Sequence, residues 1–170
     1  GQSVSLSADG QTVAIGANSN DGTGSNAGHV RVYNYNGSVW IQLGGDIDGE
    51  TAGDSNGQSV SLSADGQTVA IGANLSDGTG SNAGHVRVYK YDVNKTTNVT
   101  DQNSADFGPV GWRRLGQDID GEAADDRSGG SVSLSSDGQT VAIGAIFNDG
   151  TGSSAGHVRV YKYDVNKTTN

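Results

Sequence analysis

GQSVSLSADGQTVAIGANLSDGTGSNAGHVRVY, residues 57–89, occurs almost unchanged at residues 1–33 and again, with more substitutions, at residues 129–161. The copies begin 56 and then 72 residues apart, because 16 additional residues lie between Tyr91 and Trp112 of the second copy. Repetition at this period is typical of folds in which one supersecondary unit recurs along the chain. The sequence therefore divides into residues 1–56, residues 57–128 with the 16-residue insertion, and a truncated third unit, residues 129–170.

Each unit contains four strand-like segments, and none has the spacing of an amphipathic helix. The strands predicted for the first unit are residues 3–7, 12–17, 29–35 and 39–47. Between the first two strands, Asp9-Gly10 favours a type I′ hairpin turn. In the third strand, Val30 and Val32 share one face. The other face carries His29, Arg31, Tyr33 and Tyr35.

Four antiparallel strands in a unit of this length predict an all-β fold, specifically a β-propeller built from four-stranded antiparallel blades. Blades pack face to face, so both faces of each sheet would be partly buried, which suits Tyr33, Tyr35 and Trp40. The small Ser and Ala side chains of the first two strands suit the crowded inner part of a blade. A parallel β-helix is the competing repeat fold, but its coils are much shorter than these units. The chain would supply about two and a half blades.

The motif Gly-x-Ser-Val-Ser-Leu-Ser, followed by Asp-Gly and Thr-Val-Ala-Ile-Gly-Ala, resembles the FG-GAP-type repeat of integrin α-subunit propellers. The resemblance covers nearly the whole chain and implies a propeller fold in an extracellular setting. The Phe of the FG pair is missing, and the Pro of GAP is replaced by Asn18, Asn74 or Ile146. The family's calcium loop between the first two strands is reduced to Ala8-Asp9-Gly10-Gln11, so the resemblance implies no cation site at that position.

The composition excludes several classes of function. The chain has 19 acidic and 10 basic side chains, and this net charge of −9 argues against a nucleic-acid partner, because phosphate recognition needs clustered Lys and Arg. No segment approaches the ~20 consecutive apolar residues of a membrane-spanning helix. The absence of Cys excludes disulfides and thiolate chemistry, and it leaves the redox compartment open.

The sequence predicts that the protein is not an enzyme. His29, His85 and His157 are the only histidines, and all three occupy one position of the repeat. A catalytic histidine needs an asymmetric set of partners, so three equivalent copies indicate a structural role, such as hydrogen bonding to the neighbouring blade. There is also no G-x-S-x-G motif, and no carboxylate pair stands out as that of a glycosidase.

Two acidic turns contain the candidate metal ligands. The segment Asp-Ile-Asp-Gly-Glu at residues 46–50 recurs at residues 118–122, and another Asp follows each copy. Alternation places both aspartates of a copy on one side of the chain, and Ca²⁺ prefers carboxylate oxygens. The candidate Ca²⁺ ligands are Asp46, Asp48, Glu50, Asp118, Asp120 and Glu122. Because the motif is shorter than an EF-hand loop, the alternative is a solvated turn with local hydrogen bonds and no cofactor.

Five N-x-[ST] sequons fall in predicted loops and are candidate N-glycosylation sites in a eukaryotic secreted protein. They begin at Asn36, Asn74, Asn94, Asn98 and Asn166.

Trp40 and Trp112 begin the fourth strand of their units, and we expect them to anchor blade packing rather than to stack on sugars. The basic pair Arg113-Arg114 is expected to form ion pairs with Asp118 or Asp120.

Two and a half blades cannot close a propeller, which typically has about 4–8. We therefore expect the chain to be part of a longer repeat protein, or to be completed by blades of other copies.

Near-identical repeats favour multivalent or structural contacts. The expected function is that of a non-catalytic, secreted or cell-surface protein in adhesion, scaffolding or structural assembly. Its partner would be a surface protein, a glycan or further copies of the chain, with no membrane insertion. The alternatives are a carbohydrate-binding propeller module and a fragment of a propeller hydrolase or lyase with active residues outside this chain.

Overall fold

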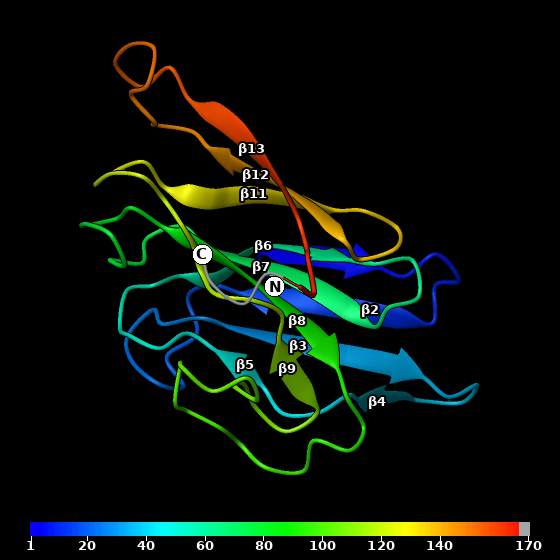
Figure 1. Cartoon of the computed structure of the whole chain (residues 1–170). Helices are drawn as coiled ribbons and strands as arrows, with labels where there is room; N and C mark the ends of the chain where they lie inside the picture. Colours follow the sequence, from blue (N-terminus) through cyan, green and yellow to red (C-terminus); the bar gives the residue numbers. More distant parts are fainter. Residues whose placement is uncertain (167–170) are drawn as a thin grey trace.

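The computed structural model describes residues 1–166, which form three antiparallel β-sheets and contain no helix (Figure 1). The first sheet comprises β1 (Ser3–Leu6), β2 (Thr12–Ala17), β3 (His29–Tyr35), β4 (Trp40–Gln42) and β5 (Ile47–Asp48). The second comprises β6 (Asn56–Leu62), β7 (Thr68–Ala73), β8 (His85–Tyr91), β9 (Trp112–Arg114) and β10 (Ile119–Asp120). The third comprises β11 (Ser128–Leu134), β12 (Thr140–Ala145) and β13 (His157–Lys162). The prediction of an all-β fold with antiparallel sheets is confirmed. Within the described residues, no helix is long and apolar enough to cross a membrane.

The register of β2 and β3 confirms the two faces predicted from the alternation. Val30 lies opposite Gly16 and Val32 lies opposite Ala14, so these side chains share one face of the first sheet. On the other face, Arg31 lies opposite Ile15. The same pairing recurs between β7 and β8 and between β12 and β13.

The prediction of one continuous fourth strand over residues 39–47 is wrong. The segment forms two short strands, β4 and β5, which pair with opposite ends of β3. Gly44, with φ of 67°, interrupts the strand in a conformation that costs glycine little. The amide of Gly45 then leaves the sheet and donates to the carbonyl of Val110 in the insertion of the second unit (2.8 Å).

The turn between β1 and β2 is not of type I′. Such a turn needs positive φ at both central residues, whereas only Gly10 of the Asp9-Gly10 pair has positive φ (69°). The carboxylate of Asp9 accepts hydrogen bonds from the hydroxyl of Ser7 (2.6 Å) and the amide of Gln11 (2.9 Å). Asp9 therefore stabilises a longer loop, which is closed by the bond from the Ser7 amide to the Thr12 carbonyl (2.9 Å).

The three sheets stack in chain order, and equivalent hydrogen bonds join each sheet to the next. The hydroxyl of Ser3 donates to the carbonyl of Gly57 (2.8 Å), and the hydroxyl of Ser5 accepts from the amide of Leu62 (2.9 Å). The equivalent bonds between the second and third sheets are Ser59 Oγ to Gly129 O (2.8 Å) and Leu134 N to Ser61 Oγ (2.9 Å). We call the side of a sheet that bears these serines its trailing face, and the opposite side its leading face.

Glycines in the second strand of a unit let the sheets approach closely. A Cβ atom at Gly16 would lie 2.2 Å from the carbonyl oxygen of Gly57 in the next sheet. At Gly72, the equivalent distance to the carbonyl oxygen of Gly129 is 2.0 Å. At Gly16 and Gly72, the Gly of the repeated Ala-Ile-Gly-Ala segment is therefore required by packing between sheets rather than by its own φ.

Two hydrophobic cores lie between the sheets, one at each junction. The first joins Val30, Val32 and Ile47 of the first sheet to Val60, Leu62, Val69, Ile71 and Trp112 of the second. The second joins Val86 and Val88 of the second sheet to Val141 and Ile143 of the third. As a result, all six residues of β7 are buried, whereas half-buried residues alternate with exposed ones along β1 and β13 at the two ends of the stack.

Candidate functional site

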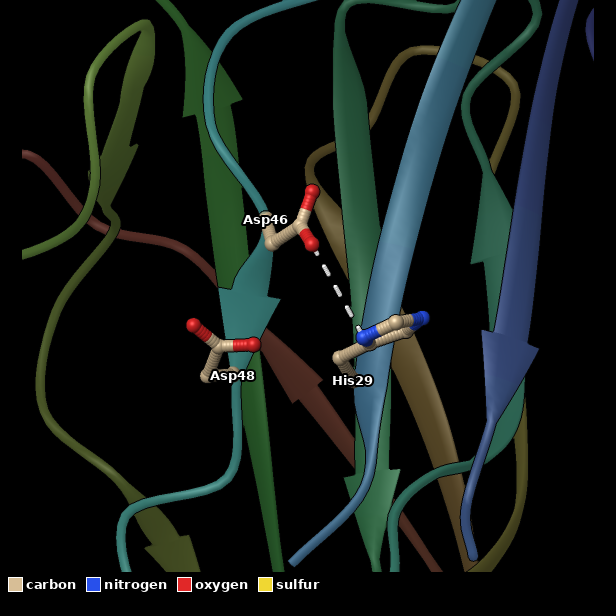
Figure 2. A group of neighbouring side chains, drawn as sticks. All are labelled: His29, Asp46 and Asp48. Carbon is tan, nitrogen blue, oxygen red and sulfur yellow. Dashed lines mark ion pairs between the residues drawn. The ribbon is translucent and has the colours of Figure 1, made fainter. Parts of the chain in front are cut away.

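The first candidate site gathers His29, Asp46 and Asp48 at one end of the first sheet (Figure 2). In β5, Ile47 is only 2% exposed and points into the core between the sheets. The flanking Asp46 and Asp48 therefore point the other way, as the alternation predicted. Asp48 lies opposite His29 of β3 in the register. One ligand atom from each of the three side chains lies within 4.8 Å of those of the other two.

Arginine already neutralises one carboxylate of this group. Arg31 donates to both oxygens of Asp46, from Nε to Oδ1 (3.0 Å) and from Nη2 to Oδ2 (2.7 Å), and Gln42 donates a further bond to Oδ1 (2.7 Å). The Arg31 hydrogen bonds hold the pKa of Asp46 below its usual range. Burial and the charge of Asp46 raise the pKa of Asp48, which has no arginine partner in the described part of the chain.

The second sheet repeats the arrangement with His85, Asp118 and Asp120. Here Asp118, the equivalent of Asp46, has two arginine partners. Its Oδ2 lies 2.5 Å from Nη2 of Arg87, and its Oδ1 lies 2.5 Å from Nη1 of Arg114. Burial raises the pKa of Asp118, but hydrogen bonding to Arg87 outweighs it and the net pKa is lowered. Burial and the charge of Arg87 lower the pKa of His85 to about 4, so the imidazole is neutral at pH 7.

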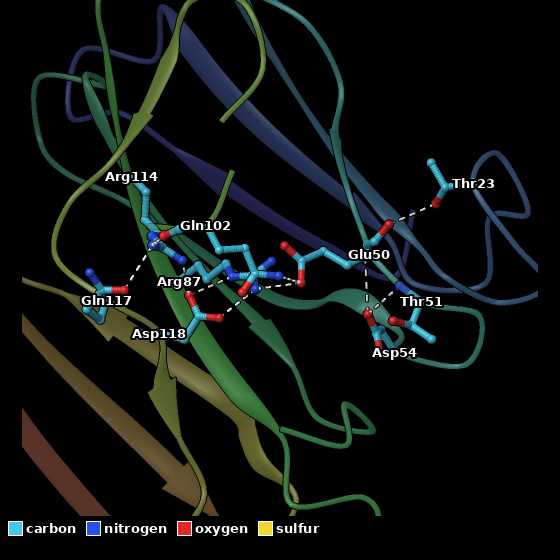
Figure 3. Close-up of polar contacts among 10 residues, drawn as sticks. Thr23, Glu50, Thr51, Asp54, Arg87, Gln102, Arg114, Gln117 and Asp118 are labelled. Carbon is cyan, nitrogen blue, oxygen red and sulfur yellow. Dashed lines mark hydrogen bonds and ion pairs between the residues drawn. The ribbon is translucent and has the colours of Figure 1, made fainter. Parts of the chain in front are cut away.

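The predicted ligands Glu50 and Glu122 lie outside these two groups. Glu50 reaches the next sheet and pairs with Arg87 (2.9 Å), so that this arginine, only 5% exposed, bridges Asp118 of its own sheet and Glu50 of the preceding one (Figure 3). Glu122 likewise pairs with Arg159 of the third sheet. The repeat thus builds an arginine clamp between successive sheets rather than one five-residue metal loop.

Sequence reasoning missed this clamp, although the spacing contained a signal for it. Glu50 precedes Arg87 by 37 residues, and Glu122 precedes Arg159 by 37 residues. The spacing persists because each pair spans the same junction between sheets.

The aspartates that follow the acidic segments hold turns. Asp54 accepts hydrogen bonds from the amides of Glu50 (3.2 Å) and Thr51 (2.9 Å). Asp126 does the same for the amides of Glu122 (3.1 Å) and Ala123 (3.0 Å). These carboxylates therefore make the local hydrogen bonds of the turn alternative, but they are buried rather than solvated, at 6% and 3% exposed.

The insertion of the second unit covers one end of the clamp. Phe107 is 7% exposed, and its ring centroid lies 4.6 Å from the guanidinium carbon of Arg114 and 5.4 Å from that of Arg87. The side-chain amide of Gln102 donates to Glu50 (2.7 Å). The backbone carbonyl of Gln102 accepts a hydrogen bond from Arg114 (2.6 Å). Arg114 is thus buried, with Asp118 as its partner as predicted, whereas Arg113 pairs instead with Asp92 (2.9 Å) and Asp106 (3.0 Å).

The insertion also helps to enclose a cavity of about 430 Å³ between the first and second sheets. The residues that line it include Asp46, Asp48, Glu50, Gln102, Tyr89 and Phe107. A second cavity, of about 410 Å³, shares Glu50 and Gln102 with it and reaches His85 and Asp120. The first unit lacks the insertion, because only a short turn separates its Tyr35 from Trp40.

The two tryptophans have different environments. Trp112 is fully buried in the first core, and its indole N–H donates to the carbonyl of Leu43 (2.9 Å), which confirms the predicted packing role. The same prediction is wrong for Trp40, which is 47% exposed, because it lies on the leading face of the first sheet and no other sheet of residues 1–166 packs against that face.

All five sequon asparagines lie outside strands, as predicted. Four are exposed, whereas Asn74 is half-buried and its enclosed side-chain oxygen has no hydrogen-bond partner among the described residues. The exposed four are Asn36, Asn94, Asn98 and Asn166, and the last belongs to a sequon whose remaining residues lie outside the described part of the chain.

A scan against protein-family models and a search of curated proteins each gave no match to this chain.

Proposed function

We propose that the three sheets are blades of a β-propeller, and that the protein is a non-catalytic scaffold in adhesion or structural assembly at the cell surface or outside the cell. The observation that carries the proposal is the repeated junction. The same serine bonds, glycine contact and Glu–Arg ion pair join the first sheet to the second and the second to the third. Because the same junction recurs with every unit, further units can be added to the stack in the same way. Addition stops when the curvature of the stack closes it into a ring.

Two further observations support a role without catalysis and outside the cell. The three histidines occupy the same position of three strands, and Asp46 and Asp118 are bound to arginines rather than free to transfer protons. The resemblance to FG-GAP-type repeats, itself part of the proposal, supports the extracellular setting. The exposed sequon asparagines are consistent with glycosylation there, which a loss of mass on enzymatic deglycosylation of the native protein would test.

Electron microscopy of the native assembly tests the propeller. Radial sheets around a central axis would support the proposal, whereas a straight, uncurved stack would refute it.

A panel of chromogenic glycosides and polysaccharides tests the absence of catalysis. Turnover that is abolished in the Asp46→Asn, Asp48→Asn double variant would show that the protein is an enzyme.

Carbohydrate binding is a second candidate function, favoured by the cavity of about 430 Å³. Aromatic rings with carboxylate and amide groups can bind sugar rings through stacking and hydrogen bonds. A glycan array should then give hits that the Gln102→Ala variant loses and the Val93→Ala variant keeps, because Val93 is 73% exposed and is not among the residues that line the cavity. An array without hits at millimolar sensitivity removes this candidate.

Divalent-cation binding is a separate proposal, carried by Asp48 and Asp120, whose carboxylates have no arginine partner among residues 1–166. With the neighbouring histidines they offer few donors, and Ca²⁺ prefers about six to eight oxygens, so backbone carbonyls or water would have to complete the shell. A bound Ca²⁺ should raise the melting temperature saturably, and the Asp48→Asn, Asp120→Asn double variant should lose this effect. Coincident melts in EDTA and in excess Ca²⁺, at matched ionic strength, would refute the proposal.

A further inference from the structure

The two ends of the stack expose the same surfaces that its interior buries. On the leading face of the second sheet, Val60 and Leu62 are 8% and 7% exposed, whereas the equivalent Val4 and Leu6 of the first sheet are 67% and 59% exposed. This face of the first sheet thus carries the side chains of a junction, but no other sheet formed by residues 1–166 lies against it.

The trailing face of the third sheet is open in the same way. Val158 and Val160 are 69% and 66% exposed. Their equivalents on the trailing face of the second sheet, Val86 and Val88, are 0% and 8% exposed. These large differences arise at identical local sequences, so only the missing neighbour accounts for them.

We infer that the trailing face of the third sheet binds the leading face of the first sheet of a second copy of this chain. A second copy is the expected partner because each internal junction joins a trailing face to a leading face. The two ends of the chain expose one face of each kind. The contact is heterologous, since different faces of the two copies meet. The inference rests on the stacking in the proposed function but not on its closure into a propeller.

The internal junctions specify the contacts that this one should make. The hydroxyls of Ser131 and Ser133 are exposed and have no partner in the described residues. By equivalence with Ser3 and Ser5, Ser131 should donate to the carbonyl of Gly1 in the second copy. Ser133 should likewise accept from the amide of Leu6 of that copy. Two polar contacts and two pairs of apolar side chains therefore fix a single register between the copies.

Sedimentation velocity and light scattering over a dilution series of the full chain test the inference. The wild-type chain should associate with increasing concentration. Leu6→Lys on the leading face or Val160→Lys on the trailing face should each weaken association about 100-fold or more, because an unpaired ammonium would be buried against apolar side chains. Both residues are exposed in the single chain, so the variants should keep the wild-type circular dichroism spectrum and melting temperature. Val93→Lys, at an equally exposed site in the insertion, is the matched control and should associate like the wild type.

A mixing experiment tests the head-to-tail geometry. Leu6→Lys retains an intact trailing face and Val160→Lys an intact leading face, so the two variants should be monomeric alone and form a 1:1 dimer when mixed. A wild-type chain that stays monomeric up to its solubility limit would overturn the inference. So would single variants that associate normally, or a mixture that forms no dimer. A wild-type assembly of fixed size would agree with propeller closure. An open, growing polymer would refute closure while upholding the head-to-tail contact.

Discussion

Replacing Gly72 by Ala should destabilise the protein by blocking the approach of the third sheet to the second. The new Cβ would lie 2.0 Å from the carbonyl oxygen of Gly129 and 2.5 Å from the hydroxyl of Ser59. The hydroxyl can rotate, but the backbone carbonyl cannot, so the sheets must separate. Overpacking of this kind costs about 1–3 kcal/mol, and loss of the bond from Ser59 to Gly129 adds about 1 kcal/mol. The total of about 2–4 kcal/mol corresponds to a fall in melting temperature of about 5–15 °C for a chain of this size.

The third unit provides a matched control for this measurement. Gly144 has the same neighbours in sequence, and a Cβ there would meet only the hydroxyl of Ser131 in its own sheet (2.4 Å). Gly144→Ala should therefore change the free energy of unfolding by less than about 1 kcal/mol. Urea unfolding, followed by circular dichroism at a concentration where light scattering shows monomer, compares the two variants. Equal losses of stability would refute the argument, because they would show that the cost arises within a sheet rather than between sheets.

Three other perturbations follow from the same junctions. Trp112→Ala should cost about 3–5 kcal/mol in urea unfolding, whereas Trp40→Ala, at the equivalent exposed position, should cost less than about 1 kcal/mol; similar losses would contradict the difference in burial. Arg87→Ala should cost about 3–5 kcal/mol, because it leaves Asp118 buried with one partner fewer, whereas Arg31→Ala breaks an exposed pair and should cost about 0–1 kcal/mol; the reverse order would overturn the arginine clamp. The pKa of His85 is about 4 in the folded chain and 6.5 for the ordinary group, so between these pH values the unfolded chain binds one more proton than the folded chain. The free energy of unfolding should therefore fall by about 3 kcal/mol as the pH is lowered from 6.5 to 4. His85→Gln should flatten this part of the pH profile of unfolding, and an unchanged slope would show that another group is responsible.

Much of the fold follows from short-range alternation in the sequence. The predicted strand over residues 29–35 coincides with β3, and the predicted faces of Val30 and Arg31 are those observed. Alternation also placed Asp46 and Asp48 on one side of the chain, where the structure brings them to His29. These predictions succeeded because neighbours in a strand point to opposite faces whatever the sheet packs against.

The errors concern positions whose conformation depends on partners distant in sequence. The fourth strand breaks at Gly44, beside Val110 of the following unit, and no periodicity in residues 39–47 signals that contact. Nothing near residues 46–50 in the sequence signals that Glu50 forms an ion pair with Arg87 across the junction. The insertion gave no strand pattern, yet it places Phe107 against two arginines.

The sequence by itself determined the number of repeats, the first three strands of each and the two chemically distinct faces of those strands. Only the tertiary structure decided what those faces contact. Identical segments provide the clearest comparison, because Val4 is 67% exposed while the equivalent Val60 is 8% exposed. Side-chain direction is set by the local backbone, and so the sequence encodes it. Burial is set by whether another sheet lies against the face, which depends on the position of a unit in the stack rather than on its own residues.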